Sequence, residues 1–372
     1  MSRPTSAFID LSALKENLKM LSELHQKNAD GSQSVGAKTP KIIAVVKANA
    51  YGNGAIEVAQ AIESRVDLLA IAFAHEALEL REAGITKPIL VLQGPHQLVD
   101  LSLTFSHNLY WMLHTDWQAE ALSAFFAEQN KSSQTWFKFD TGMHRLGFGL
   151  DDFDRVQHTY KSLWQANTVV CSHLACADEV IQQHAQQQID KFLQNVEDSD
   201  YPRCIANSAT HVRFTNARQD YVRLGIAMYG STPFTAEDSP ITLAPVMHFE
   251  SQIIALRTIP KGDAVGYGAT WQAKRESVIA TVALGYADGY PRHAPTGTPA
   301  YCNGQTIPLV GRVSMDMLTF DVTDLTAVAI GDTVQLWGDK MPINQVADHV
   351  GTIGYELMTR VSARVPRVYK KK

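Results

Sequence analysis

The sequence predicts an α/β fold in which an N-terminal (β/α)8 barrel is followed by a mostly β C-terminal domain. Over the first two thirds of the 372 residues, short apolar runs alternate with longer segments of helical periodicity, a pattern typical of parallel strands linked by helices. From about Pro240 the chain changes to short β-branched segments separated by Gly, Pro or Asp. We therefore expect the barrel over residues 10–240, and the β-rich domain over residues 241–372 together with residues 1–9.

The barrel prediction depends on eight apolar runs, each interpreted as one strand. They recur at intervals of roughly 20 to 34 residues, which is enough for one strand and one helix each. Asp10 is a good N-cap, and leucines at helical spacing after it predict a first helix that ends before a loop around residues 31–41. The runs are Ile42 to Val46, Leu68 to Phe73, Ile89 to Leu92, Leu109 to Leu113, Thr135 to Asp140, Val169 to His173, Cys204 to Ala206 and Tyr221 to Leu224; helices are expected near 75–83, 116–129, 151–165 and 181–196.

The second domain is predicted from short segments rich in β-branched residues. A tight hairpin turn is expected at Asn303-Gly304, because this pair favours the left-handed backbone that such turns need. The expected strands are 248–259, 277–284, 300–309, 317–322 and 333–337.

Composition excludes several classes of partner. The net charge is −5 and the estimated pI is near 6.2, so no cationic field favours nucleic acid or an anionic membrane. The basic segment from Arg364 to Lys372 is expected to be a solvated tail.

No stretch approaches the roughly 18 apolar residues of a membrane span and no signal peptide is evident, so we expect a cytoplasmic protein. The spacing of Cys171, His173 and Cys176 matches no usual zinc pattern, and no metal is expected.

Lys47 is the most informative single residue. It directly follows the buried run 42–46 and precedes Ala48 to Gly54, which is interpreted as a loop. A lysine at the mouth of an α/β sheet is partly desolvated, which lowers its pKa and frees the neutral amine for Schiff-base chemistry.

Other residues with reactive, charged or hydrogen-bonding side chains also follow the predicted strands, where barrel enzymes place their active sites. An amine of this kind, with Ser208 and the backbone amides of Gly225 and Ile226 late in the barrel, points to a phosphorylated carbonyl cofactor, for which pyridoxal phosphate is the natural candidate. These residues are Lys47 and Tyr51 after the first strand, Asp140 with Arg145 after the fifth, His173 after the sixth, Asn207-Ser208 after the seventh, and Arg223 to Ile226 at the eighth.

Motifs along the whole chain resemble those of the alanine racemases. The stretch from Ala44 to Gly52 is similar to that family's cofactor-lysine motif, although Asn53 stands where many relatives carry histidine. Further similar segments are 138–147, 172–173, 207–209, 222–230, 266–270, 285–290, 313–316 and 354–356.

The resemblance implies a head-to-tail homodimer whose active sites take residues from both subunits. It implies that Lys47 holds pyridoxal phosphate and acts as one base, while Tyr267 of the partner subunit is the other base. His173 and Arg223 resemble the hydrogen-bonding chain that reaches this tyrosine, and Arg223 faces the pyridine nitrogen. Racemisation needs two such groups because a proton leaves one face of the α-carbon and another returns to the opposite face.

The resemblance also implies the remaining site residues. Arg145 is expected to bind the substrate carboxylate, assisted by the backbone amide of Met315 from the partner subunit. Lys138 matches a position that is carbamylated in many relatives; an unmodified lysine paired with Asp140 is the alternative. Tyr286 matches a residue of the substrate entrance, with a packing role as the alternative. The expected phosphate ligands are Tyr51, Ser208, Gly225, Ile226 and Tyr355, with Asn207 beside them.

The predicted function is the interconversion of L-alanine and D-alanine, supplying D-alanine for peptidoglycan, although a catabolic role and serine as a side substrate stay open. A related pyridoxal-phosphate decarboxylase is one alternative, but it would want a carboxylate where Arg223 stands. A non-enzymatic pyridoxal-phosphate carrier is another, but it would end near residue 235. A cofactor-free aldolase using Lys47 is the third.

Overall fold

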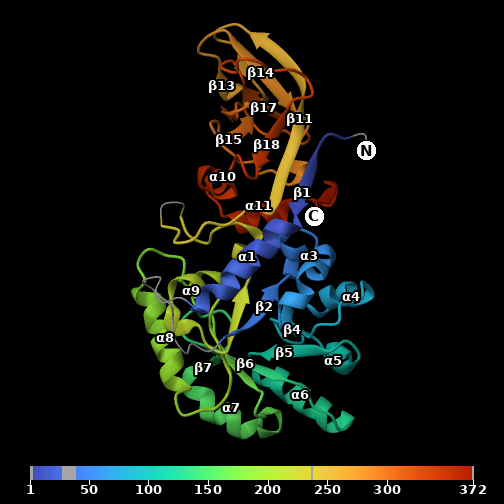
Figure 1. The fold of residues 1–372 in the computed structure, drawn as a ribbon, viewed down its shortest axis with the longest axis vertical. Helices are drawn as coiled ribbons and strands as arrows, with labels where there is room; N and C mark the ends of the chain where they lie inside the picture. The colour runs from blue at the N-terminus through green and yellow to red at the C-terminus, as the bar shows by residue number, and fades with distance from the viewer. Residues whose placement is uncertain (1–2, 27–38, 236–237, 371–372) are drawn as a thin grey trace. The chain divides into compact units, whose positions relative to one another are not determined.

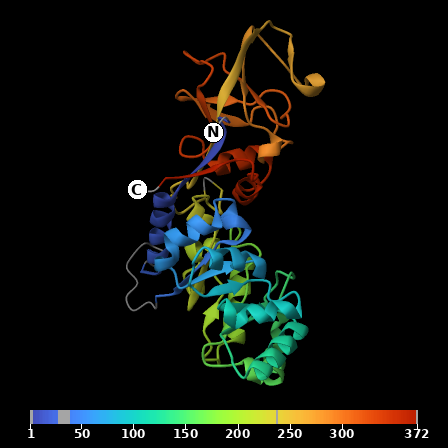
Figure 2. The same cartoon turned by 90° about the vertical axis from the view of Figure 1, so that its right-hand side faces the viewer.

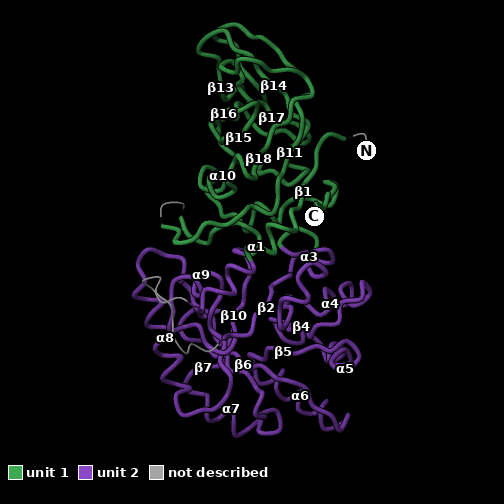
Figure 3. Tube along the Cα trace, in the orientation of Figure 1, with its two compact units in different colours: residues 1–17, 51–54, 228–372 green, residues 18–50, 55–227 purple. Residues whose placement is uncertain are grey.

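The computed structural model describes residues 3–26, 39–235 and 238–370 (Figure 1). They form two compact units, which Figure 3 distinguishes by colour. Unit 1 comprises residues 1–17, 51–54 and 228–372, and unit 2 comprises residues 18–50 and 55–227. The sequence placed residues 1–9 with the second domain and the other boundary at residue 240, whereas the two units divide after residues 17 and 227. The strand at the start of the chain pairs within unit 1, and the chain returns to that unit directly after the eighth barrel strand.

Unit 2 contains the predicted barrel. Its eight main strands are parallel and follow the order β10-β2-β3-β4-β5-β6-β8-β9. The two strands at the ends of this order, β9 and β10, approach each other. The amide of Arg223 in β10 donates to the carbonyl of Ala206, just after β9. The main strands are β2 (Lys41–Val45), β3 (Leu68–Ile71), β4 (Ile89–Val91), β5 (Leu109–Leu113), β6 (Thr135–Asp140), β8 (Val169–Cys171), β9 (Arg203–Cys204) and β10 (Tyr221–Leu224), and the short β7 (Phe148–Gly149) pairs with β6.

The barrel strands are buried on both faces. Strands β3 and β4 are buried at every position, as expected for a parallel sheet covered by helices. The helices lie on the outer side of the strands in both Figure 1 and Figure 2. They include α3 (Ala55–Ile62), α4 (Ala74–Glu82), α5 (Leu103–Ser106), α6 (Asp116–Gln129), α7 (Phe153–Thr159), α8 (Gln183–Asn195) and α9 (Ser208–Arg213).

The predicted first helix is α1 (Leu11–Glu23), and Asp10 caps it by accepting from the amides of Ser12 and Ala13. Most of the loop expected around residues 31–41 lies outside the described residues. The run from Ala48 to Tyr51, expected as part of a loop, forms a turn of left-handed backbone.

Unit 1 is built on a mostly antiparallel sheet of order β16-β15-β18-β11-β1-β19, with β14 joining β11 and β17. Asn303 and Gly304 both have positive φ at the β15–β16 turn, as predicted. The expected solvated tail is wrong for residues 367–370, which form β19 and pair with β1. The elements are β1 (Ser6–Asp10), β11 (Met247–Ile259), β12 (Ala264–Val265), β13 (Trp271–Gln272), β14 (Ser277–Val282), β15 (Pro299–Cys302), β16 (Gln305–Pro308), β17 (Leu318–Asp321), β18 (Thr333–Trp337), α10 (Ile343–Val350), α11 (Gly354–Arg360) and β19 (Arg367–Lys370).

Within the described part of the chain, no helix is both long and apolar enough to cross a membrane.

Candidate active site

A pocket of about 360 Å³ lies at the carboxyl ends of the barrel strands. Its lining carries four cationic side chains and no carboxylate, so it suits an anionic ligand. The lining residues are Lys47, Ala72, Leu92, Gln93, Met112, Lys138, Arg145, Leu146, Ser172, His173 and Arg223. Five of the residues singled out from the sequence therefore come together here: Lys47, Lys138, Arg145, His173 and Arg223.

Lys47 has the environment that the sequence predicted. Burial lowers the pKa of its amine, the Arg145 guanidinium lowers it further, and the Glu76 carboxylate opposes the shift. A lysine of lowered pKa has a larger neutral fraction and is a better nucleophile and base at neutral pH.

The chain turns sharply after Lys47. Ala48, Asn49, Ala50 and Tyr51 all have φ between 52° and 54°, which makes one turn of left-handed helix. L-residues adopt this conformation at a cost of roughly 1–2 kcal/mol each. The surrounding structure must therefore hold the turn in place.

Arg145 stands on a loop that Asp140 organises. The Oδ1 atom of Asp140 accepts from the amides of Gly142, Met143 and His144 over 2.9, 2.9 and 3.2 Å. The guanidinium of Arg145 makes no hydrogen bond or ion pair to any other residue in the described ranges, and the side chain is exposed. It is therefore available to bind a carboxylate bidentately.

Lys138 is buried within β6, and its side chain is 7% exposed. Burial lowers the pKa of its amine to about 8. Asp140, its alternative partner, uses its oxygens for the three loop amides and for the His144 ring. Among the described residues no ion pair joins Lys138 to Asp140.

Arg223 is held by acceptors on two neighbouring strands. Its Nη1 donates to the carbonyl and Sγ of Cys204 over 3.2 and 3.0 Å. Its Nη2 donates to the carbonyl of Ser172 over 2.9 Å, to that of Ile205 over 3.3 Å, and to Nδ1 of His173 over 2.9 Å. Burial and the nearby Arg223 guanidinium hold the pKa of His173 well below its usual value.

The residues expected around the phosphate fall into two groups. In unit 2, Ser208 Oγ accepts from the amide of Gly225 over 2.9 Å, and Ile226 follows directly in the chain. Asn207 caps α9 by accepting from the amide of Thr210 over 2.9 Å.

The other expected phosphate ligands, Tyr51 and Tyr355, both belong to unit 1. Their ring centroids lie 5.8 Å apart. Burial raises the pKa of Tyr51, so its hydroxyl stays protonated and able to donate.

Tyr267, Tyr286 and Met315 also belong to unit 1, on loops that are exposed. The amides of Tyr286 and Ala287 donate to the carbonyls of Ser314 and Met315, both over 3.0 Å. Tyr267 is 70% exposed and Met315 is 54% exposed. A large exposed aromatic and an exposed methionine are typical of a surface that meets another chain.

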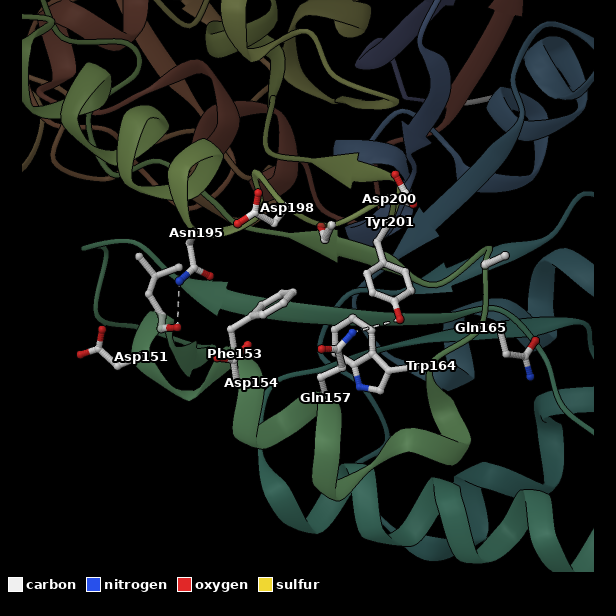
Figure 4. A pocket seen from close by; sticks show the side chains of 13 residues that line it. Asp151, Phe153, Asp154, Gln157, Trp164, Gln165, Asn195, Asp198, Asp200 and Tyr201 are labelled. Carbon is white, nitrogen blue, oxygen red and sulfur yellow. Dashed lines mark hydrogen bonds between the residues drawn. The ribbon is translucent and has the colours of Figure 1, made fainter.

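A larger pocket, of about 700 Å³, lies on another part of unit 2 and is not a candidate active site (Figure 4). It lies before β8 and β9, at the amino ends of these strands, and its lining contains Asp151, Asp154, Asp198 and Asp200 but no cationic side chain. It therefore offers no amine for covalent chemistry.

Sequence reasoning missed several residues of the smaller pocket. Gln93 directly follows the predicted strand 89–92, so the rule that selected Lys47 would have found it. Ala72 and Met112 line the pocket within or directly beside strands, and their residue types carry no chemical signal.

Known proteins are similar to this chain over its whole length. Residues 9–233 match the family model of the alanine racemase N-terminal domain, and residues 246–369 match that of the C-terminal domain. An alanine racemase of Alteromonas mediterranea is 42% identical over 370 residues, which cover 100% of this chain and 99% of that protein. The catabolic alanine racemase of Pseudomonas aeruginosa is 39% identical and covers 99% of each chain.

The solved structures agree in fold. The crystal structure of the biosynthetic alanine racemase from Pseudomonas aeruginosa has a TM-score of 0.90 and 39% identity, covering 99% of this chain and 100% of that one. Matches of this extent show that the chain belongs to the alanine racemase family and is an enzyme that racemises alanine.

Proposed function

We propose that the enzyme interconverts L-alanine and D-alanine with pyridoxal 5'-phosphate held covalently by Lys47. The observation that carries this proposal is the placement of Lys47, with a lowered pKa, in a cationic pocket beside Arg223 and Arg145. The pocket fits the cofactor because it offers an amine for the carbonyl carbon and donors for anionic groups, and its lining holds no carboxylate. When bound, the cofactor supplies an electron sink that acidifies the α-carbon of an amino acid.

Arg223 would face the pyridine nitrogen of the cofactor. The acceptors around its Nη1 and Nη2 fix the guanidinium plane, and a guanidinium only donates hydrogen bonds. It therefore leaves the pyridine nitrogen without a proton and weakens the electron sink. A weaker sink favours return of the proton over side reactions.

Two bases would move the α-proton, one from each subunit. Lys47 serves one face of the α-carbon, and Tyr267 of the partner subunit serves the other. His173 accepts from Arg223 at Nδ1 and is left with an Nε2 proton to donate to the tyrosine oxygen. A tyrosine with an ordinary pKa near 10 needs such donors before it can act as a base.

Arg145 would bind the substrate carboxylate, with the backbone amide of Met315 from the partner subunit. Its loop keeps it at the pocket while leaving the guanidinium free. Lys138 would carry a carbamate, whose negative charge orients Arg145. The lowered pKa of Lys138 favours this modification, since only the neutral amine reacts with CO2.

The phosphate would be bound by the Ser208 hydroxyl, the amides of Gly225 and Ile226, and the hydroxyls of Tyr51 and Tyr355. Asn207 supports this group as the cap of α9. Tyr286, on the exposed loop beside Met315, would line the substrate entrance.

The working unit would be a homodimer in the cytoplasm that supplies D-alanine for peptidoglycan. The exposure of Tyr267 and Met315 supports the shared site. A catabolic role is the alternative, since the catabolic and the biosynthetic alanine racemase of Pseudomonas aeruginosa are both 39% identical to this chain. Full-length membership of the family sets aside the decarboxylase, carrier and aldolase alternatives.

Mixing two inactive variants tests the shared site directly. Lys47→Ala and Tyr267→Ala should each be inactive alone, as measured by chiral chromatography of L-alanine incubated with cofactor-loaded protein. After the two are unfolded and refolded together, half of the dimers are mixed and each holds one complete site, so about a quarter of the wild-type activity should return. No recovery, despite mixed dimers seen by mass spectrometry, would contradict the two-subunit site.

A further inference from the structure

Glu76 makes contacts that join the segment after Lys47 to the neighbouring strand. Its Oε1 accepts from the amide of Ala48 over 2.6 Å, one residue beyond Lys47. Its Oε2 accepts from the amides of Ala72 and Phe73 over 2.8 and 3.0 Å, directly after β3. One carboxylate therefore binds three backbone amides from two barrel segments.

These bonds matter because the turn they hold is strained. Each of the residues 48–51 has a left-handed conformation that is unfavourable for L-residues, and a strained backbone persists only where its surroundings fix it. Other polar contacts also hold the turn: the amide of Ala50 donates to the carbonyl of Val46 over 2.8 Å, Asn49 accepts from the amide of Ala55 over 2.8 Å, and the carbonyl of Tyr51 accepts from the Asn53 side chain over 3.2 Å. Among the described residues, Glu76 is the side chain that connects Ala48, the first residue of the turn, to the segment directly after β3.

We propose that Glu76 is a positioning residue for Lys47: its carboxylate clamps the left-handed turn after β2 to the end of β3 and thereby fixes where the lysine amine points. This inference rests on the proposed role of Lys47. Glu76 does not line the pocket and touches no reacting group, so the clamp acts on Lys47 through the backbone. Its negative charge also raises the pKa of Lys47 against the effect of burial and Arg145.

Asp100 provides a matched control. Its Oδ2 accepts from the amides of His96 and Gln97 over 2.8 and 3.0 Å, after β4, in the same cap arrangement that Glu76 makes after β3. It makes no bond to the turn that follows Lys47. Asp100→Asn therefore perturbs a cap of the same kind without touching the turn.

Glu76→Gln separates the two sets of bonds that the side chain makes: one to the turn after Lys47, and one to the amides of Ala72 and Phe73 that cap α4. A glutamine has one acceptor oxygen, which is expected to stay on the two cap amides, so that its NH2 group faces the amide of Ala48 and the turn loses its bond. In the holoenzyme, hydrogen exchange of the amides of residues 48–51 should then rise at least about tenfold, while exchange in α4 stays near the wild-type rate. Asp100→Asn should change neither.

Kinetics give the second readout. Because a misplaced reacting group costs up to about 100-fold in rate, kcat of Glu76→Gln should fall roughly 10- to 100-fold. The KM for alanine should change less than about twofold, because Arg145 stands on a different loop. Adding Ala48→Gly, which eases the left-handed backbone, should restore part of kcat. If Glu76→Gln proves unstable, Glu76→Ala measured in the same way takes its place.

Wild-type kcat in Glu76→Gln would overturn the inference, whether the turn exchanged normally or became mobile. A fall in kcat without faster exchange of residues 48–51 would overturn it too, and so would an equal loss in Asp100→Asn. These outcomes are distinct from failure of the proposed function, in which wild-type protein itself would leave L-alanine unconverted.

Discussion

Nη2 of Arg223 lies 2.9 Å from Nδ1 of His173. Because a guanidinium only donates, His173 accepts at Nδ1 and carries its proton on Nε2. Burial and the adjacent positive charge make a second proton on this ring unfavourable.

His173 is therefore expected to stay neutral across the working pH range. Nitrogen-15 NMR of labelled imidazole should show the Nε2–H tautomer on both sides of the ordinary midpoint of about pH 6.5, with no titration there. The pH profile of kcat/KM for alanine should show no step there either. A ring that titrated near pH 6.5 would contradict the arrangement.

Asp140→Asn should weaken substrate binding more than it slows the chemistry. A neutral amide oxygen accepts the three loop amides more weakly than the carboxylate oxygen does, and the contact of Oδ2 with the His144 ring is lost, so the loop carrying Arg145 loosens. We expect KM for alanine to rise about tenfold, a loss comparable to one charge-assisted hydrogen bond, with a smaller fall in kcat. Asp152→Asn, which alters an exposed pair with Arg155, is the control and should match wild type.

Lys138 should carry a CO2-derived group. With a pKa of about 8, a substantial fraction of its amine is neutral near pH 7.5. Carbon-13 NMR of protein equilibrated with labelled bicarbonate should show a carbamate signal that disappears in Lys138→Gln. Lys161→Gln, at an exposed lysine outside the pocket, should leave the signal unchanged. Absence of the signal in wild-type protein would support an unmodified lysine.

His211 should make the fold sensitive to acid. It is fully buried, its Nε2 lies 2.7 Å from the carbonyl of Leu21, and burial lowers its pKa to about 4. The unfolded chain takes up a proton below about pH 6.5 while the folded protein does not, so falling pH favours unfolding. Between pH 6.5 and pH 4 this costs about 3 kcal/mol, at roughly 1.4 kcal/mol per pH unit.

Urea unfolding over this pH range measures that cost. His211→Gln keeps a donor for the Leu21 carbonyl but does not titrate, so its free energy of unfolding should fall less steeply with pH. Equal slopes for the variant and wild type would contradict the assignment.

Asp288→Asn should destabilise unit 1. The Asp288 carboxylate is fully buried and pairs with Arg3 over 2.5 Å and with Arg364 over 3.0 Å, while also accepting from the amide of Gly285. Removing the charge leaves two guanidinium groups without their shared partner, and we expect Tm to fall by several degrees. Asp316→Asn, which removes a half-exposed partner of Arg364, should lower Tm much less.

The sequence alone predicted the elements whose signals are local. The eight strands of unit 2 follow from short, mostly apolar runs at regular intervals, which are typical of buried parallel strands, and a strand forms at each of the eight. Asp10 and the Asn303-Gly304 turn were equally predictable, since a cap or a tight turn is decided by the few residues that make it. The rule that barrel strands end at the active site also led to Lys47, Arg145, His173 and Arg223, and the structure brings these four into one pocket.

Other features depend on contacts between segments that are distant in sequence. The basic stretch at 367–370 forms a strand because β1, more than 350 residues earlier, offers a free edge. Ala48 to Tyr51 contains no glycine that would indicate a left-handed turn. Its conformation is held in part by Glu76, which lies on α4 after β3. The sequence thus determined which strands end at the pocket, because their apolar patterns are local, whereas the tertiary structure decided how the lysine is held, because only folding brings its supporting carboxylate within hydrogen-bonding distance.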